Sequence, residues 1–82
     1  MITWIKIKDY DLAERKEREI LVNPDNIRYL YARLRPKNAI ITQNYYDVFG
    51  LRDSNIAVTM TERGFSELEK ALSVRIPADM PN

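Results

Sequence analysis

Residues 56–72, IAVTMTERGFSELEKAL, change from a strand-like to a helix-like apolar period, and this change decides the fold class. Ile56–Met60 alternates in the manner of a half-buried strand. Thr61 is a good N-cap for a helix over about residues 61–73. The apolar face of that helix is formed by Phe65, Leu68, Ala71 and Leu72. A strand that leads directly into a helix predicts an α+β domain.

The N-terminal half adds further strands to this unit. Ile2–Ile7 and Ile20–Val22 are rich in strand-forming residues, and the two segments are suited to antiparallel pairing. The charged stretch Asp9–Glu19 between them is interpreted either as a solvated hairpin connection or as a short exposed helix. Ala39–Tyr46 is predicted to be another strand, followed by a loop over Asp47–Asn55.

The segment after Val22 has two interpretations. Asn23 as N-cap, Pro24 in the first turn and helically spaced apolar residues favour a helix that Pro36 ends. The alternative is a strand over Ile27–Arg35 that turns at residues 36–38 into the next strand. The pattern alone favours the helix.

Length and composition restrict the function. The chain has 82 residues, a net charge of +1 and neither Cys nor His. We therefore expect one domain over residues 1–76, a disordered tail over 77–82, and no catalysis, cofactor or metal. No apolar run is long enough to cross a membrane, no secretory signal is visible, and we expect a cytoplasmic protein. In so small a core, Trp4 is expected to be a central packing residue.

Two motifs resemble a known group of proteins. WIKI at residues 4–7 and ILVNPDNI at residues 20–27 are similar to small bacterial and phage-borne domains labelled flagellar-protein-like. The resemblance extends to Leu30 and, loosely, over Ile56–Leu72. It implies a small, strongly bent β-sheet with a C-terminal helix, a tight turn over residues 23–27 and a strand from Arg28 onward. On this ground we expect the strand, not the helix, in the segment after Asn23. It also implies a phage or mobile-element adaptor or inhibitor that acts on a host protein.

A second, shorter likeness covers Val58–Gly64 and Leu68–Leu72. These residues resemble the passage from wing to last helix in winged-helix regulators, although the upstream helices of that fold are not evident. We therefore expect an α+β domain with a small, twisted antiparallel sheet of about four strands and the C-terminal helix packed on one face.

A basic and aromatic segment is the main candidate site. Basic residues interleaved with aromatic ones can hold a phosphate backbone and stack on bases. The plainer interpretation is a solvated strand face, which the chain's near-neutral charge favours. The segment also suits an acidic protein partner. The candidate residues are Arg28, Tyr29, Tyr31, Arg33, Arg35 and Lys37, with Tyr45 and Tyr46 in the next segment.

The remaining polar groups carry less information. The spacing of Asp9, Asp11 and Glu14 could bring three carboxylates together around a hard cation, but the glycine and the distal bidentate Glu of a calcium loop are missing. These residues are therefore interpreted as an exposed acidic loop neutralised by nearby Lys and Arg. We therefore expect a small module that binds another protein through a sheet face, a strand edge or its charged loop. Nucleic-acid binding through the basic segment is the alternative. Association of the chain with a second copy of itself through an unpaired edge is also open.

Overall fold

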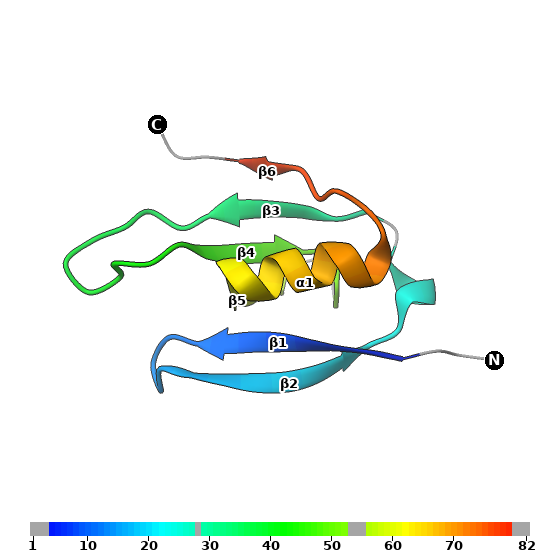
Figure 1. Cartoon of the computed structure of the whole chain (residues 1–82), viewed down its shortest axis with the longest axis horizontal. Coiled ribbons are helices and arrows are strands. Elements are labelled where there is room, and N and C mark those ends of the chain that lie inside the picture. Colours follow the sequence, from blue (N-terminus) through cyan, green and yellow to red (C-terminus); the bar gives the residue numbers. More distant parts are fainter. Residues whose placement is uncertain (1–3, 28, 53–55, 80–82) are drawn as a thin grey trace.

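The computed structural model describes residues 4–27, 29–52 and 56–79, and it confirms the α+β class (Figure 1). Its strands form a two-stranded sheet, β1–β2, and a four-stranded sheet in the order β5–β4–β3–β6. The elements are β1 (Ile5–Asp11), β2 (Lys16–Val22), a 3₁₀ turn η1 (Pro24–Asn26), β3 (Tyr31–Leu34), β4 (Tyr45–Phe49), β5 (Val58–Thr61), α1 (Glu62–Leu72) and β6 (Ala78–Asp79).

The larger sheet is mixed rather than wholly antiparallel. β4 pairs antiparallel with both β3 and β5, whereas the short β6 pairs parallel with β3. β1 runs beside β5, although the two strands share no hydrogen-bonded ladder (Figure 1). The hairpin therefore extends the layer of strands beyond β5, and α1 contacts β1, β4 and β5 from one side.

The charged stretch after β1 forms a hairpin, so the alternative of a short exposed helix is wrong. The two strands continue into it and leave only residues 12–15 as the turn. The register places Lys8 opposite Glu19, and Asp9 opposite Arg18. Opposite charges facing each other across the ladder stabilise this register.

The segment after Val22 is a turn and then a strand, so the helix favoured by the pattern is wrong there. The Asn23 side chain does act as an N-cap, accepting a 3.0 Å hydrogen bond from the Asp25 amide, and Pro24 occupies the first helical position. The helix ends within three residues, at an extended Ile27. Pairing of β3 with strands on both sides replaces the helical hydrogen bonds.

The next strand lies further along the chain than predicted. Residues 39–42 are irregular, and β4 covers Tyr45–Phe49, which includes part of the segment predicted to be a loop. Ile40 is 76% exposed, so its strand-forming side chain finds no layer to pack against. The connection between β3 and β4 projects beyond the end of the sheet (Figure 1).

The core lies between α1 and the strands. Phe65 and Leu68 of α1 are buried, and the Phe65 ring stacks on Tyr46 at a centroid distance of 4.4 Å. Thr61 caps the helix as predicted, accepting a hydrogen bond from the Gly64 amide at 3.1 Å. Ala71, expected on the apolar face, is exposed. The buried cluster consists of Ile7, Val22, Ala32, Tyr46, Val48, Leu51, Val58, Met60, Phe65, Leu68 and Ile76.

The C-terminal segment returns to the sheet instead of leaving it. Ser73 ends α1 in the left-handed conformation, and the Glu69 side chain accepts a 2.9 Å hydrogen bond from the Ile76 amide. The Pro77 carbonyl then accepts a bond from the Ala32 amide, and β6 follows. Residues 77–79 are therefore part of the sheet, where a disordered tail was predicted.

Trp4 lies outside the core. Its side chain is 54% exposed, so the expected central packing role is wrong. The centre of the core is instead filled by Met60, Leu68, Val48 and Val58. Trp4 is left as an exposed aromatic residue at the start of β1.

Candidate functional site

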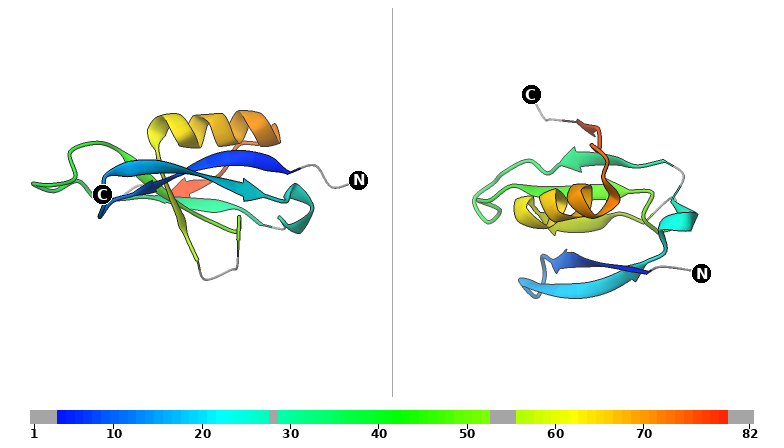
Figure 2. Two further views of the ribbon diagram at one scale, coloured as in Figure 1. Left: turned by 90° about the horizontal axis from the view of Figure 1, so that it is seen from below. Right: turned by 45° about the vertical axis from the view of Figure 1, so that its right-hand side comes forward.

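The face of the larger sheet that points away from α1 carries the candidate site. Side chains alternate along β3, so Ala32 is buried toward α1 while Tyr31 and Arg33 are exposed on the other side. No helix of the described residues covers that side (Figure 2). We call it the open face; its residues are Tyr31, Arg33, Arg35, Asp47, Phe49, Thr59 and Asp79.

Aromatic rings form one end of the open face. Tyr31 of β3 faces Phe49 of β4 in the ladder, and their rings stack at 4.9 Å with planes 12° apart. Tyr29 lies against Tyr31, with ring centroids 5.8 Å apart, and is 69% exposed. These three rings make a rigid aromatic surface that the core does not use.

Charged residues of opposite sign occupy the rest of the open face. Arg35 forms an ion pair with Asp47 at 3.3 Å, and the Thr59 hydroxyl donates a 2.6 Å hydrogen bond to the same carboxylate. The ladder places Arg33 between Asp47 on β4 and Asp79 on β6. Within the described residues Arg33 forms no ion pair. The open face therefore alternates positive and negative groups across its strands.

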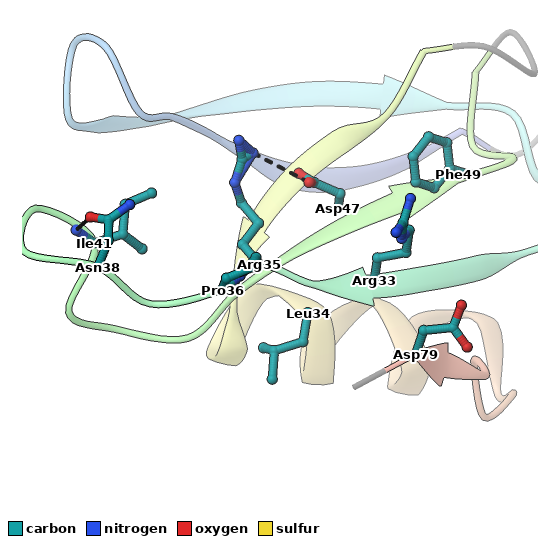
Figure 3. Close-up of a pocket in the computed structure, with 9 residues that line it drawn as sticks. All are labelled: Arg33, Leu34, Arg35, Pro36, Asn38, Ile41, Asp47, Phe49 and Asp79. Atoms are coloured by element: carbon teal, nitrogen blue, oxygen red, sulfur yellow. Dashed lines mark hydrogen bonds and ion pairs between the residues drawn. The ribbon is translucent and has the colours of Figure 1, made fainter. Parts of the chain in front are cut away.

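A surface cavity of about 440 Å³ lies beside the C-terminal end of β3 (Figure 3). In Figure 3, Arg33, Arg35, Asp47 and Phe49 lie on one side of the sheet, while Leu34 points to the other. The cavity is lined by Arg33, Leu34, Arg35, Pro36, Asn38, Ile41, Asp47, Phe49 and Asp79.

Asn38 organises the loop that borders this cavity. Its side-chain oxygen accepts hydrogen bonds from the amides of Ile40 and Ile41, both at 2.8 Å. The backbone N–H of Asn38 donates a hydrogen bond to the Ile41 carbonyl at 2.9 Å. These bonds fix the backbone of the loop beside the open face.

The basic and aromatic segment predicted from the sequence is partly assembled. Tyr29, Tyr31, Arg33 and Arg35 lie together on or beside the open face. Lys37 is exposed in the loop after β3. Arg28 lies outside the described residues. Of the two later tyrosines, Tyr46 is buried on the α1 side, and Tyr45 stacks on Tyr10 at 4.8 Å.

Sequence reasoning missed four residues of the open face, and no local signal identified them. Asp47 and Phe49 belong to a segment predicted to be a loop, and Asp79 to the predicted tail. Thr59 was predicted to be in a strand, but its hydrogen bond to Asp47 was not predicted. The two carboxylates change the electrostatics, because they place negative charge beside arginines that are uninterrupted by acids in the sequence.

The acidic residues of the hairpin are held by basic neighbours. Arg18 forms ion pairs with Asp9 and Asp11, both at 3.4 Å. Hydrogen bonds from the amides of Glu14 and Ala13 hold the pKa of Asp11 below its usual range. No group of three acidic residues suited to a metal ion occurs among the described residues.

Two tyrosines of β4 have perturbed acidity. A side-chain hydrogen bond with Tyr10, together with burial, raises the pKa of Tyr45. Burial is also the main cause of the raised pKa of Tyr46, with Glu62 and Glu69 adding to it. Both hydroxyls stay protonated near neutral pH, as packing residues do.

Comparisons with known proteins do not identify a relative. No protein-family model, curated protein or solved structure matches the chain. In the part of the chain that the structure describes, no helix has the length and apolar character needed to cross a membrane.

Proposed function

We propose that this protein is a non-catalytic module that binds another protein through the open face. The observation that carries the proposal is the aromatic surface next to Arg33, where the exposed rings of Tyr29 and Tyr31 lie with the half-buried ring of Phe49. Tyr and Arg are the residue types that most often dominate protein interfaces. The sheet does not need these rings for its own core, which lies on the side of α1.

The alternating charge of the open face favours a protein partner over nucleic acid. A phosphate backbone presents negative charge at every nucleotide, so it is repelled by Asp47 and Asp79 on both sides of Arg33. A protein segment can place a carboxylate at Arg33 and a cationic or hydroxyl group at the flanking acids. Electrostatic matching of this kind sets specificity at interfaces.

The chemistry of the cavity supports a binding role rather than catalysis. Asp47 is one of the two carboxylates that line it, and both of its oxygens are engaged, one by Arg35 and one by Thr59. The chain also contains no His or Cys to act as a general base or nucleophile.

Matched surface variants test the proposal. Wild-type protein, the double variant Tyr29→Ser/Arg33→Ala and the control Arg63→Ala are immobilised and exposed to the same native lysate. Arg63 is exposed on α1, away from the open face, so its replacement removes one arginine without altering the site. We expect a defined set of proteins to bind the wild type and the control but not the double variant. Equal retention on all three columns contradicts the proposal.

Nucleic-acid binding is the second candidate, because stacked rings next to an arginine also suit single-stranded bases. Titration of a labelled single-stranded oligonucleotide at several salt concentrations separates the two candidates. Phosphate contacts predict affinity that falls steeply with salt, with a slope reduced in Arg33→Ala but not in Arg63→Ala. Absence of binding at low salt removes this candidate.

A further inference from the structure

The outer edge of β2 and a groove next to it, lined by both polar and apolar residues, form a second surface, separate from the open face. Within the described residues, no strand pairs with this edge of β2 (Figure 1). The neighbouring groove has a volume of about 710 Å³ and includes Trp4, Leu21 and Ile56, which are 54%, 60% and 49% exposed. Three large apolar side chains around one groove beside an unpaired strand indicate an interaction surface.

The pairing rules of antiparallel strands limit how two copies of β2 can meet. In an antiparallel pair, a residue whose backbone N–H and C=O groups point toward the partner strand lies opposite a residue whose N–H and C=O groups point back toward it. Such residues recur at every second position along a strand. Two copies related by a two-fold axis therefore pair even-numbered residues with even-numbered ones, and odd with odd.

The charged half of β2 is unsuited to this pairing. Lys16 and Arg18 are even-numbered, whereas Glu17 and Glu19 are odd-numbered. Every two-fold register centred on this half therefore opposes like charges, because the residue on the axis, whether a basic residue or a glutamate, faces its own copy. Like charges directly opposite each other destabilise a sheet.

The apolar half of β2 has no such conflict. In the register centred on Leu21, this residue faces Leu21 of the second copy, and Ile20 faces Val22. The flanking pair is Glu19 with Asn23, which carries no like charge. We propose that a second copy of this chain pairs antiparallel with β2 at Leu21 and covers the groove formed with Trp4 and Ile56. The register centred on Ile20 also avoids like charges, but it sets Glu19 against Leu21 and Arg18 against Val22. The match of apolar with apolar residues therefore selects the register centred on Leu21, which is self-complementary as a two-fold dimer requires.

The dimer is expected to dissociate on dilution. Only a few backbone hydrogen bonds and a small apolar area are gained at each copy, which places the interface at the weak end of the size range. Sedimentation equilibrium from about 10 µM to about 1 mM covers such affinities. We expect the average mass of the wild type to rise from monomer toward dimer across this range.

Leu21→Arg tests the register, because it places two guanidinium groups opposite each other at the two-fold axis. This variant should remain monomeric throughout the range, and far-ultraviolet circular dichroism should show an unchanged fold because Leu21 is exposed. Trp4→Ser tests the groove without changing β2, and it should weaken dimerisation several-fold. Val74→Arg is the matched control, since Val74 is 47% exposed, follows α1 and does not line the groove. It should dimerise like the wild type.

Hydrogen exchange locates the interface directly. The amides of β2 near Leu21 should exchange faster when the wild type is diluted, whereas Leu21→Arg should show fast exchange at all concentrations. A wild type that stays monomeric near 1 mM overturns the proposal. A Leu21→Arg variant that still dimerises overturns it as well. Because Tyr29 and Arg33 lie on the other surface, their replacement should leave this equilibrium unchanged.

Discussion

Replacing Ile76 by alanine should destabilise the protein severely, although the residue lies at the point where the sequence predicts that order ends. Ile76 is only 4% exposed and belongs to the buried cluster. Truncation of a buried isoleucine to alanine costs about 2–5 kcal/mol, because a cavity adds to the lost burial. A chain of 82 residues has a free energy of unfolding of about 4–12 kcal/mol, so the loss is a large fraction of the total.

Urea unfolding followed by far-ultraviolet circular dichroism measures this effect. The matched control is Val74→Ala, which removes an exposed side chain two residues away and should change stability by less than about 0.5 kcal/mol. A difference of about 3 kcal/mol corresponds to a melting temperature lower by about 12–24 °C. If the two variants are equally stable, the segment does not dock, and Asp79 is not held beside Arg33.

Three further measurements test local features of the fold. Thr61→Ala removes the helix cap and should lower the free energy of unfolding by about 1 kcal/mol in urea, whereas Thr61→Ser should preserve it. Gly50→Ala should destabilise more than the cap variant, because Gly50 has a φ of 99° and an added methyl would collide with the Tyr29 carbonyl; equal stability with wild type would contradict this. The hydrogen bond from the Glu14 amide lowers the pKa of the Asp11 carboxyl group. The stabilisation that this hydrogen bond gives to the folded protein is therefore present above the ordinary carboxylate range and is lost as pH falls through the lowered pKa. The proton shift of that amide should titrate with a midpoint below the usual aspartate value, and a midpoint at or above it refutes the assignment.

The elements that depend on neighbouring residues were the predictable part of the fold. α1 was predicted from the helical spacing of its apolar residues and from the N-cap Thr61. The Thr61 hydroxyl accepts a hydrogen bond from the amide of Gly64, only three residues along the chain. The strand before it follows from simple alternation. The charges of the hairpin were recognised as mutually compensating, although only the ladder shows that β1 and β2 continue through them.

The local pattern of residues did not predict the elements that depend on distant partners, and the strand after Asn23 was expected only from the resemblance. The signals for a helix after Asn23 were real, and they produced the short turn η1. In the segment after η1, Ala32 pairs with β4 on one side and with β6 on the other. This pairing makes the segment a strand instead of a helix. β6 itself has only two residues, so it exists only because Ile76 is buried and the Pro77 carbonyl bonds to β3. No local pattern encodes such a strand.

The same dependence on distant partners changes the interpretation of the candidate site. Along the sequence, Arg33 and Arg35 belong to a basic run, and that run suggested a phosphate-binding strand. Across the sheet, each arginine has a carboxylate neighbour supplied by a segment at least a dozen residues away, Asp47 or Asp79. The neighbouring carboxylates weaken the long-range attraction that drives nucleic-acid binding, but they leave the rings of Tyr29 and Tyr31 and the directional donors of Arg33 exposed. A surface of that kind discriminates between partners by contact geometry rather than by total charge. The open face should therefore bind one protein segment selectively and bind polyanions weakly.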